Sequence, residues 1–353
     1  MNGLLEILDT GPAVTIQDQG RPGYARFGLS AGGAMDAYAL AEGATLLGNR
    51  NYDAALEMAG YGGKFRAVNQ SFWIALTGAP MQSYIDGKPV EWRTSLLLNP
   101  GQTLKIGATL NTTCKGTYGY LHVAGGIQVE PEIVAMGTHL RAGIGGIDGK
   151  VLTTGAQLSV GSTLNLRSKD TPHQAMTLPA PAYLKRRAIR VLWGPQAERF
   201  KESTRQRFLD EEFTLSHRRD RMAMRLQLGP DQPAFEALLT GLSDPIQDGD
   251  IQMTGDGVPA ILMREHQPTG GYPRIATIIS ADHAAIAQLP TGEPFRFELI
   301  TLDQAVEELR RWRNQMKSLA HAVQPVIRSP EEIDNLLDYN LIDGVISAGD
   351  PTT

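Results

Sequence analysis

The sequence predicts a mostly β protein with a few peripheral helices. Short apolar runs bounded by Gly, Pro, Asn or Asp recur along most of the 353 residues, and such spacing is typical of antiparallel strands joined by turns. Two other segments, one after Asp36 and one after Thr301, repeat apolar residues at helical spacing. Because a chain of this length usually forms about two domains, we expect two β modules.

The first module is expected over residues 1–180. A strand up to Val14 precedes polar turns, and the helix that follows Asp36 ends at Gly48-Asn49, a pair that favours a helix C-cap. From Lys64 to Leu166, short strands alternate with turns, as in a barrel or sandwich. This module should therefore consist of β-sheet with one early helix.

The second module is expected over residues 187–300, after a linker rich in Pro and Ala. Its most informative stretch is Gln247–Ile279, in which apolar strands flank the polar loop 264–273. The paired glycines of this loop, Gly270 and Gly271, allow backbone N–H groups to approach a ligand closely. A tight turn without a ligand explains the composition equally well, so both interpretations stay open.

The last segment, residues 301–353, is predicted to be a helical extension. Thr301 and Gln304 form a capping-box pattern, and apolar residues follow on one stripe of the helix. Ser329-Pro330 is a second helix-start signal, with proline at the first helical position. Two helices should therefore close the chain.

Composition and charge exclude several classes of protein. The formal net charge is −5, which argues against a nucleic-acid-binding protein because such proteins need a concentrated basic face. No apolar run approaches the roughly 18 residues of a membrane span, and the N-terminus lacks a signal-peptide pattern, so we expect a cytoplasmic protein. Cys114 is the single cysteine and the seven histidines show no metal-ligand spacing, so neither a disulfide framework nor a metal site is expected.

Two segments resemble known cofactor-binding motifs but lack residues or spacings that those motifs require. In the glycine-rich loop Arg141–Lys150, five residues separate Gly143 from Gly149 where a P-loop has four, and Val151 occupies the Ser or Thr position. Met316-Lys317 has the residue types of a biotin-attachment pair but lies in a predicted amphipathic helix. We therefore expect neither nucleotide binding by this loop nor covalent biotin on this chain.

The remaining candidates for chemistry are polar residues and glycines in loops. Arginine suits bidentate recognition of carboxylate or phosphate, carboxylates can accept a proton, and amide or glycine N–H groups can polarise a carbonyl. The catalytic candidates are Asp18, Asp36, Gln267 and Thr269. The substrate-binding candidates are Arg21, Arg141, Arg221, Tyr272, Arg274, Gly270 and Gly271.

Several of these candidates also have purely structural interpretations. Asp18 and Arg21 could form an ion pair that fixes a turn, and Tyr272 could pack at the mouth of a barrel. Arg221 and Arg225 have the spacing of residues on one face of a strand, where salt bridges that line a barrel are an equal alternative. If the candidates instead act together, the turns of both modules must converge on one cleft.

Several sequence blocks follow one another in a characteristic order, namely Thr15–Gly23, Gly33–Asp36, Gly48-Asn49, Leu56-Glu57, Arg141–Gly149 and Gln267–Pro273. They resemble the signature of the allophanate hydrolase subunit 2-like family. That family has Thr-x-Gln-Asp-x-Gly-Arg-Pro-Gly, Gly-Ala-Met-Asp, a helix ending in Gly-Asn, Leu-Glu, Arg-Ala-Gly-x-Gly-Gly-x-x-Gly and Gln-Thr-Thr-Gly-Gly-Tyr-Pro. The resemblance extends from about Leu5 to Leu299.

This resemblance implies two cyclophilin-like β-barrel modules and a subunit of an ATP-dependent amidohydrolase that opens the lactam of 5-oxoproline to glutamate. It implies a subunit 1-like partner, similar to the B subunit of 5-oxoprolinase, with the A subunit supplying further chemistry and with ATP in the assembled complex. The loop 267–272 would frame the carbonyl. Arg21, Arg141 or Arg274 would hold a carboxylate or phosphate. Asp18 or Asp36 would accept or donate the proton.

The chain departs from the family pattern at three places. Pro268 replaces a threonine, Val134–Thr138 replaces Gly-Ser-Arg-Ser-Thr, and Ala223-Met224 replaces Gly-Tyr. A missing arginine matters if it would have paired with a substrate carboxylate. Two other functions therefore stay open: a biotin-dependent carboxyltransferase component that acts on urea or a similar small amide, and a non-catalytic regulatory subunit.

Overall fold

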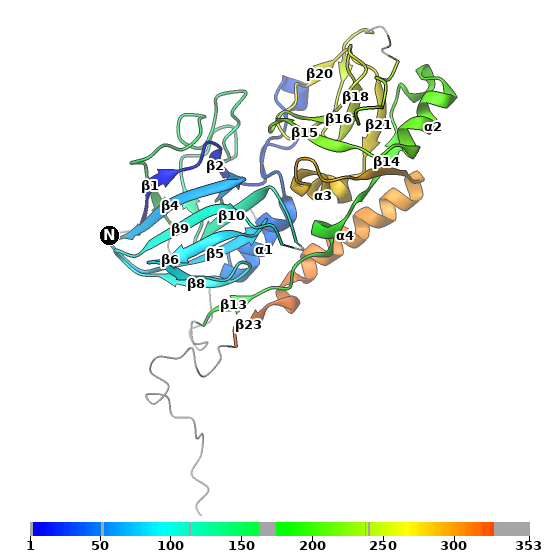
Figure 1. Cartoon of the computed structure of the whole chain (residues 1–353). Coiled ribbons are helices and arrows are strands. Elements are labelled where there is room, and N and C mark those ends of the chain that lie inside the picture. Colours follow the sequence, from blue (N-terminus) through cyan, green and yellow to red (C-terminus); the bar gives the residue numbers. More distant parts are fainter. Residues whose placement is uncertain are drawn as a thin grey trace, which may run out of the picture.

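The computed structural model describes residues 3–50, 53–112, 114–161, 174–236, 238 and 241–327. It contains two β-rich halves that lie side by side (Figure 1). Residues 178–187, which we call the connecting segment, and the long helix α4 (Leu302–Ala322) join the two halves. The sheets are almost entirely antiparallel, and the helices are few. The expectation of a mostly β protein with a helix near the C-terminus is therefore confirmed.

The N-terminal half consists of two antiparallel sheets. The seven-stranded sheet has the order β11-β12-β1-β4-β9-β6-β7, with strands β1 (Leu4–Thr10), β4 (Tyr61–Val68), β6 (Met81–Ile85), β7 (Lys88–Pro89), β9 (Thr103–Thr109), β11 (Ile127–Gln128) and β12 (Gln157–Val160). The five-stranded sheet has the order β2-β3-β10-β5-β8, with strands β2 (Val14–Gln17), β3 (Ala55–Ala59), β5 (Phe72–Gly78), β8 (Ser95–Leu98) and β10 (Tyr118–Val123). Apolar side chains of both sheets, among them Leu5, Phe65 and Leu121, form one core.

Helix α1 (Ala37–Leu47) forms where the sequence predicts it. The Asp36 carboxylate accepts a hydrogen bond from Ala39 N at 3.0 Å, so it satisfies a backbone donor at the helix N-terminus. Gly48 ends the helix with a φ of 68°, a conformation that glycine adopts without steric cost. The helix packs on the five-stranded sheet, against β5 and β10.

The C-terminal half contains one seven-stranded sheet in the order β15-β16-β19-β18-β21-β14-β22. Its strands are β14 (Ala188–Trp193), β15 (Thr214–Arg219), β16 (Ala223–Gln227), β18 (Asp250–Met253), β19 (Pro259–Leu262), β21 (Arg274–Ile278) and β22 (Arg296–Leu299). Strands β14 and β22 pair in parallel. A bridge between Phe213 and Phe295 joins residues beside the two edge strands β15 and β22, so the sheet curves into a partial barrel.

Shorter elements complete the fold. A two-stranded sheet pairs β17 (Asp244–Pro245) with β20 (Thr269–Gly270). The remaining helices are α2 (Glu202–Asp210), α3 (His283–Gln288) and the 3₁₀ turns η1 (Ala25–Phe27), η2 (Ala182–Lys185), η3 (Ala197–Arg199) and η4 (Ser280–Asp282). Within the described ranges, none of the helices has the length and apolar character needed to cross a bilayer.

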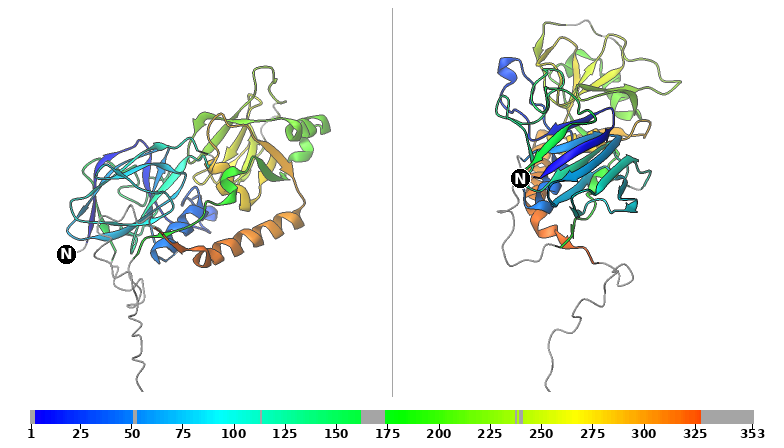
Figure 2. Two further views of the ribbon diagram at one scale, coloured as in Figure 1. Left: turned by 60° about the horizontal axis from the view of Figure 1, so that its bottom comes forward. Right: turned by 90° about the vertical axis from the view of Figure 1, so that its left-hand side faces the viewer.

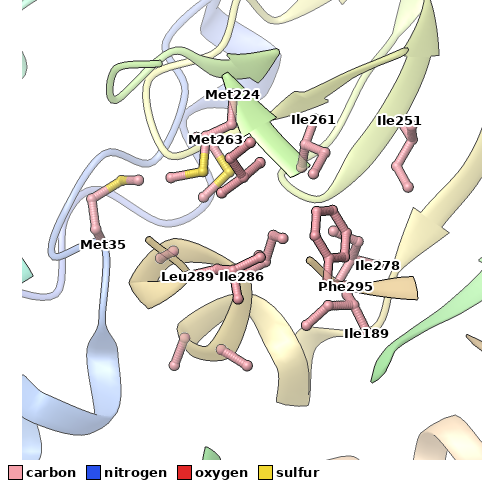
Figure 3. Packing of buried hydrophobic residues seen from close by; sticks show 14 of the residues in the cluster. Met35, Ile189, Met224, Ile251, Ile261, Met263, Ile278, Ile286, Leu289 and Phe295 are labelled. Atoms are coloured by element: carbon pink, nitrogen blue, oxygen red, sulfur yellow. The ribbon is translucent and has the colours of Figure 1, made fainter. Parts of the chain in front are cut away.

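The apolar core of the C-terminal half continues into the N-terminal half. Met35, which precedes α1, belongs to the same buried cluster as Met224, Met263 and Leu289. Figure 3 shows the Met35 side chain on the side of this cluster that faces the N-terminal half. Because the two halves share buried apolar surface, the hydrophobic effect favours one fixed arrangement of them.

Helix α4 (Leu302–Ala322) runs along both halves and contacts α1 (Figures 1 and 2). The predicted capping box fixes its start, because Gln304 N donates to Thr301 Oγ1 at 3.2 Å and Thr301 N donates to Gln304 Oε1 at 2.8 Å. After α4, β23 (Gln324–Pro325) pairs with β13 (Met176–Thr177). The predicted second helix start at Ser329-Pro330 lies outside the described residues.

Candidate functional site

The predicted site residues fall into two groups. The seam group lies in or near the contact between the two halves and consists of Asp18, Arg21, Asp36, Arg141 and Arg221. The glycine-loop group lies between β19 and β21 or at the start of β21, and consists of Gln267, Thr269, Gly270, Gly271, Tyr272 and Arg274.

In the seam group, Arg21 and Asp18 hold one loop of the N-terminal half. The Arg21 side chain is 0% exposed, and its guanidinium donates to three carbonyl oxygens of that loop, those of Glu132, Ala135 and Gly137, at 3.0, 3.2 and 2.8 Å. The Asp18 carboxylate accepts from Met136 N at 2.7 Å. Burial lowers the pKa of Arg21 even though nearby carboxylates oppose this shift. Both side chains therefore bind the protein's own backbone.

The loop held by Arg21 contains two residues in an unfavourable conformation. Ile133 and Val134 have φ angles of 49° and 63°, in the left-handed region that β-branched residues rarely adopt. The Val134 side chain is 72% exposed, so burial does not compensate for the backbone strain. The neighbouring hydrogen bonds to Arg21 and Asp18 hold the loop in this conformation.

Arg221 joins the two halves through a buried ionic cluster. Its guanidinium donates to Glu57 on β3, to Glu265 at 2.5 Å and to Gly33 O at 2.6 Å. Burial alone would lower the pKa of Arg221, but the two carboxylates outweigh burial and raise the pKa. Arg221 lies in the turn before β16, whereas Arg225 lies on β16 and pairs with Asp256 near the surface. The two arginines therefore do not form one lining of the barrel.

Asp36 connects α1 to two other elements. One carboxylate oxygen caps α1, and the other accepts hydrogen bonds from Tyr183 Oη at 2.6 Å and from Gln288 Nε2 at 2.8 Å. Burial raises the pKa of Asp36 above its usual range, although these hydrogen bonds oppose the shift. Its oxygens thus link α1, the connecting segment and the end of α3.

Arg141 begins the glycine-rich loop 141–150, which does not fit a bound nucleotide. Arg141 N donates to Glu265 Oε2 at 3.2 Å. Further along, Gly143 N donates to His139 O at 2.9 Å, Gly145 N to the Glu132 carboxylate at 2.8 Å and Gly146 N to Met136 O at 2.8 Å. Because the protein itself occupies these N–H groups, they are not available to cradle a phosphate.

A small cavity of about 150 Å³ opens beside the seam group. Asp18, Gln19, Gly32 and Arg264 supply its polar side, and Met316 of α4 closes it against the apolar face of α1. Arg264 also pairs with Asp248 at 2.9 Å. Asp18 lies at the edge of this cavity, and its carboxylate oxygens accept hydrogen bonds from Gly20 N and Met136 N.

The glycine-loop group borders a larger cavity of about 270 Å³, which we call the glycine-loop cavity. One wall is the loop backbone of Gly270 and Gly271 with Tyr272, whose side chain is 39% exposed. The opposite wall contains Gln196, Arg199, Gly241, Leu242 and Asp244. The Arg199 guanidinium lies beside Gly241, because a Cβ there would be 3.4 Å from its terminal nitrogen. The cavity therefore combines a cation, an amide and a carboxylate with exposed backbone.

Arg274 does not line this cavity but forms hydrogen bonds with residues of its wall. Its Nε donates to Gln196 Oε1 at 2.9 Å, and one terminal nitrogen donates to Pro245 O at 2.6 Å and to Asp250 at 3.2 Å. Gln196 in turn donates to Asp244 at 3.0 Å. Arg274 thereby fixes the two polar residues that line the cavity, Gln196 and Asp244.

Gln252 on β18 lies directly beneath the glycine loop. Its Nε2 is buried and has no hydrogen-bond partner among the described residues. A Cβ at Gly270 would lie 2.7 Å from this nitrogen, so a larger residue there would displace either the loop or the Gln252 amide. The missing Cβ therefore lets the loop backbone pack closely on the Gln252 amide.

The other two predicted residues of the loop are less closely involved with the cavity wall. Thr269 is exposed and belongs to β20. Gln267 is half-buried, and its carbonyl oxygen lies 2.6 Å from His266 Nδ1.

The sequence did not predict three residues that line the cavity, namely Arg199, Gln196 and Asp244. No sequence signal indicates that they face a loop so much further along the chain.

The described residues contain no cluster of three or more His, Cys, Asp or Glu side chains placed to bind a metal ion. Cys114 is a free, partly buried thiol.

The arrangement of elements is similar to solved structures of much longer proteins. The urea amidolyase of K. lactis superposes with a TM-score of 0.78 at 23% identity, over 93% of this chain and 21% of that chain. The urea carboxylase of Kluyveromyces lactis superposes with a TM-score of 0.77 at 22% identity, over 93% of this chain and 31% of that chain. This chain therefore spans about a fifth to a third of those proteins, and the likeness concerns the fold.

Two curated relatives match over nearly their full length. The 5-oxoprolinase C subunit of Haemophilus influenzae is 38% identical over 313 residues, which cover 87% of this chain and 94% of that protein. The 5-oxoprolinase C subunit of Escherichia coli is 34% identical over 317 residues, which cover 90% of this chain and 98% of that protein. A family model for the carboxyltransferase domain, subdomain A and B, matches residues 27–299. The chain therefore belongs to the carboxyltransferase-domain family that contains the 5-oxoprolinase C subunits.

Proposed function

We propose that this chain is the C subunit of an ATP-dependent 5-oxoprolinase, which opens the lactam of 5-oxoproline to glutamate. The observation that carries this proposal is the match to two 5-oxoprolinase C subunits, at 38% and 34% identity over 94% and 98% of their lengths. The match to the urea amidolyase of Saccharomyces cerevisiae is weaker, at 27% identity over 16% of that protein.

The domain plan that accompanies this proposal has two cyclophilin-like barrels, over residues 1–180 and 187–300, and a C-terminal extension over residues 301–353. The two sheets of the N-terminal half and the curved sheet of the C-terminal half support this plan. The bridge between Phe213 and Phe295 supports the closure of the second barrel.

The glycine-loop cavity is the proposed site for the lactam. A lactam resists water because amide resonance stabilises it, so its carbonyl must be polarised before ring opening. Arg199 would hold the substrate carboxylate as a bidentate donor, and Arg274 would keep Gln196 and Asp244 in position. The backbone of Gly270 and Gly271 would face the carbonyl, with Tyr272 closing the side of the ring.

The share of this chain in the reaction is to hold and orient the lactam. The internal hydrogen bonds of the loop 141–150 argue against nucleotide binding there. ATP would activate the carbonyl oxygen in the assembled complex, bound either by the subunit 1-like partner, which corresponds to the B subunit, or by the A subunit.

Reconstitution of the complex tests this function. We expect ADP release by the C subunit with its B-like and A-like partners to depend on 5-oxoproline. Arg199→Gln should lower kcat/KM for 5-oxoproline by about 100-fold, because a charged hydrogen bond to the substrate is worth roughly 1.5–3 kcal/mol. Arg218→Gln, an exposed arginine on β15, is the matched control and should leave kcat/KM unchanged.

A carboxyltransferase function is the second candidate, and the description of the matching family model favours it. In that case the complex would show no lactam-dependent ADP release, and labelled carboxylate would pass from carboxybiotin to urea or a similar amide. This result would replace the 5-oxoprolinase assignment.

A further inference from the structure

Helix α4 carries an exposed stripe that begins with apolar residues and continues with basic ones. Leu302 and Val306, which are 66% and 40% exposed, form its apolar start. The basic residues follow towards the C-terminal end of the helix and are all exposed: Arg310, Arg313, Lys317 and His321. A spacing of three or four residues places all of these side chains on one face of the helix, away from the buried Ala305 and Leu319. We call this face the outer stripe of α4.

The positive charge of the outer stripe is only partly balanced within the described part of the chain. Arg310 lies 4.0 Å from Glu307, at the limit of an ion pair. Among the described residues, no carboxylate lies within ion-pair distance of Arg313 or Lys317. The helix dipole favours basic residues only in the last turn, whereas these two residues precede the end of α4 at Ala322 by nine and five positions. The dipole therefore does not explain them.

The sequence beyond Ile327, which lies outside the described residues, has the complementary composition. Residues 329–353, which we call the acidic segment, contain no Lys, Arg or His. Their carboxylates are Glu331, Glu332, Asp334, Asp338, Asp343 and Asp350. Because the formal net charge of the whole chain is −5, the acidic segment accounts for all of its net negative charge. The segment starts with the predicted helix-start signal Ser329-Pro330.

The order of residues in the acidic segment also matches the outer stripe. Asp334 and Asp338 come first, and the apolar residues Leu341 and Val345 follow, at a spacing that places them on one face of a helix. In an antiparallel alignment these four residues stay within one position of Arg313, Arg310, Val306 and Leu302, taken in that order. The carboxylates then face the guanidinium groups, and the apolar residues face one another.

The end of the described chain is also in the right place for such an alignment. β23 begins two residues after α4 ends, and Figure 1 shows β23 beyond the C-terminal end of the helix. A segment that turns back after Ile327 would therefore meet the basic part of the outer stripe first. As a helix, residues 331–346 would be about 24 Å long, and α4 between Leu302 and His321 is about 28 Å long.

We propose that the acidic segment docks on the outer stripe of α4 in the same molecule, with residues 331–346 helical and antiparallel to α4. Asp334 would pair with Arg313 and Asp338 with Arg310, and the later apolar residues would cover the apolar start of the stripe. A segment of the same chain is favoured over a separate partner because its effective concentration is about millimolar. Docking would fasten α4, the helix that joins the two halves.

Hydrogen exchange of the full chain, followed by mass spectrometry, tests the proposal. We expect the amides of residues 331–346 to exchange at least tenfold more slowly than in an unstructured peptide, at every protein concentration. Arg310→Glu combined with Arg313→Glu should remove this protection, because like charges then face each other. Adding Asp334→Arg and Asp338→Arg to that variant should restore the protection, because the ion pairs form again with the charges exchanged.

Lys201→Glu combined with Arg218→Glu is the matched control. Both residues are exposed and lie in the C-terminal half, away from α4, so this variant changes the net charge equally and should keep the protection. The proposal is wrong if residues 331–346 exchange as an unstructured peptide does, or if their protection survives Arg310→Glu with Arg313→Glu. Protection that grows with protein concentration would also overturn it, because the outer stripe would then bind the acidic segment of a second copy.

Discussion

At the scale of single residues, the loop held by Arg21 stores backbone strain. A left-handed conformation costs a β-branched residue roughly 1–2 kcal/mol, and Ile133 and Val134 adopt it in succession. The family pattern that the sequence resembles has glycine in the place of Val134, and glycine adopts the φ of 63° found here without strain. The strain is therefore a property of this sequence, imposed on a conformation that its backbone contacts maintain.

Val134→Gly should raise the free energy of unfolding by about 1 kcal/mol, because glycine adopts a positive φ without strain. Urea unfolding of the isolated chain measures the change. Val151→Gly is the matched control: Val151 is partly exposed and is not among the residues with positive φ. Val151→Gly should lower the free energy of unfolding or leave it unchanged. If Val151→Gly proved more stable than Val134→Gly, the assignment of backbone strain to Val134 would be contradicted.

His122 should make stability depend on pH. Burial lowers its pKa from 6.5 to about 3, and Thr77 Oγ1 lies 2.9 Å from its Nε2. Below pH 6.5 the His122 side chain takes up a proton in the unfolded chain but not in the folded chain. Its contribution to the free energy of unfolding is therefore complete above pH 6.5 and is lost as the pH falls towards 3. The loss is about 1.4 kcal/mol per pH unit for one proton.

His122→Gln removes this titrating group. We expect the difference in free energy of unfolding between wild type and His122→Gln to narrow as the pH falls from 7 to 5, in urea titrations at fixed ionic strength. A difference that stays constant over this range would show that His122 does not titrate on unfolding.

At the scale of elements, the loop between β19 and β21 gains its shape from what lies under it. Gly270 packs on the Gln252 amide, and Arg274 anchors the start of β21 to Gln196. The loop is thus fixed from below and at one end. Its exposed face remains available to a ligand, as expected for a functional loop on a rigid scaffold.

Gly270→Ala should lower kcat/KM of the reconstituted complex by about tenfold or more, because the new Cβ forces the loop or the Gln252 amide to move. Gly255→Ala is a suitable comparison, since its nearest neighbour, Tyr272, is 3.8 Å away. Equal kcat/KM values for the two variants would remove the glycine-loop cavity from the reaction.

At the scale of the whole molecule, a buried ionic cluster and a shared apolar core hold the two halves together. Arg221 reaches from the C-terminal half to Glu57 and Gly33 O of the N-terminal half. Glu57 also accepts from Tyr120 Oη at 2.6 Å and from Met35 N at 2.7 Å. Any motion between the halves would have to break this cluster.

Arg221→Met should lower the free energy of unfolding by about 3–5 kcal/mol, because it leaves two buried carboxylates without their partner. Glu57→Gln in the same chain should recover part of this loss. Arg225→Met removes a surface pair with Asp256 and should cost less than about 1 kcal/mol. Similar losses for the two arginines in denaturant titrations would show that the seam cluster is not buried in solution.

Local features of the fold were predictable from the sequence, whereas the site was predictable only in part. Helix α1 and the start of α4 follow from Asp36, Gly48 and the Thr301–Gln304 box, all of which act within a few residues. The glycine loop was also recognisable, because its glycines and prolines determine its own conformation.

The partners of these residues depend on tertiary contacts, which a single sequence does not reveal. Arg221 was expected on a strand beside Arg225, but it lies in the preceding turn and is held there by Glu57, more than 160 positions away. Arg199 has no motif, and its place opposite Gly271 results from the position of η3 next to β21. The roles of the predicted site residues stay predictions until turnover is measured.

The pairing of β13 with β23 brings the chain back, after α4, to the place where it left the N-terminal half. The C-terminal half is thus attached to the N-terminal half before β14 by the connecting segment and after β22 by α4 and the two-stranded sheet of β13 and β23. A protease that cut the backbone between Pro181 and Arg187 would leave two fragments that still pair through β13 and β23 and pack through α1 and α4. Nicking there would break the covalent link without separating the halves.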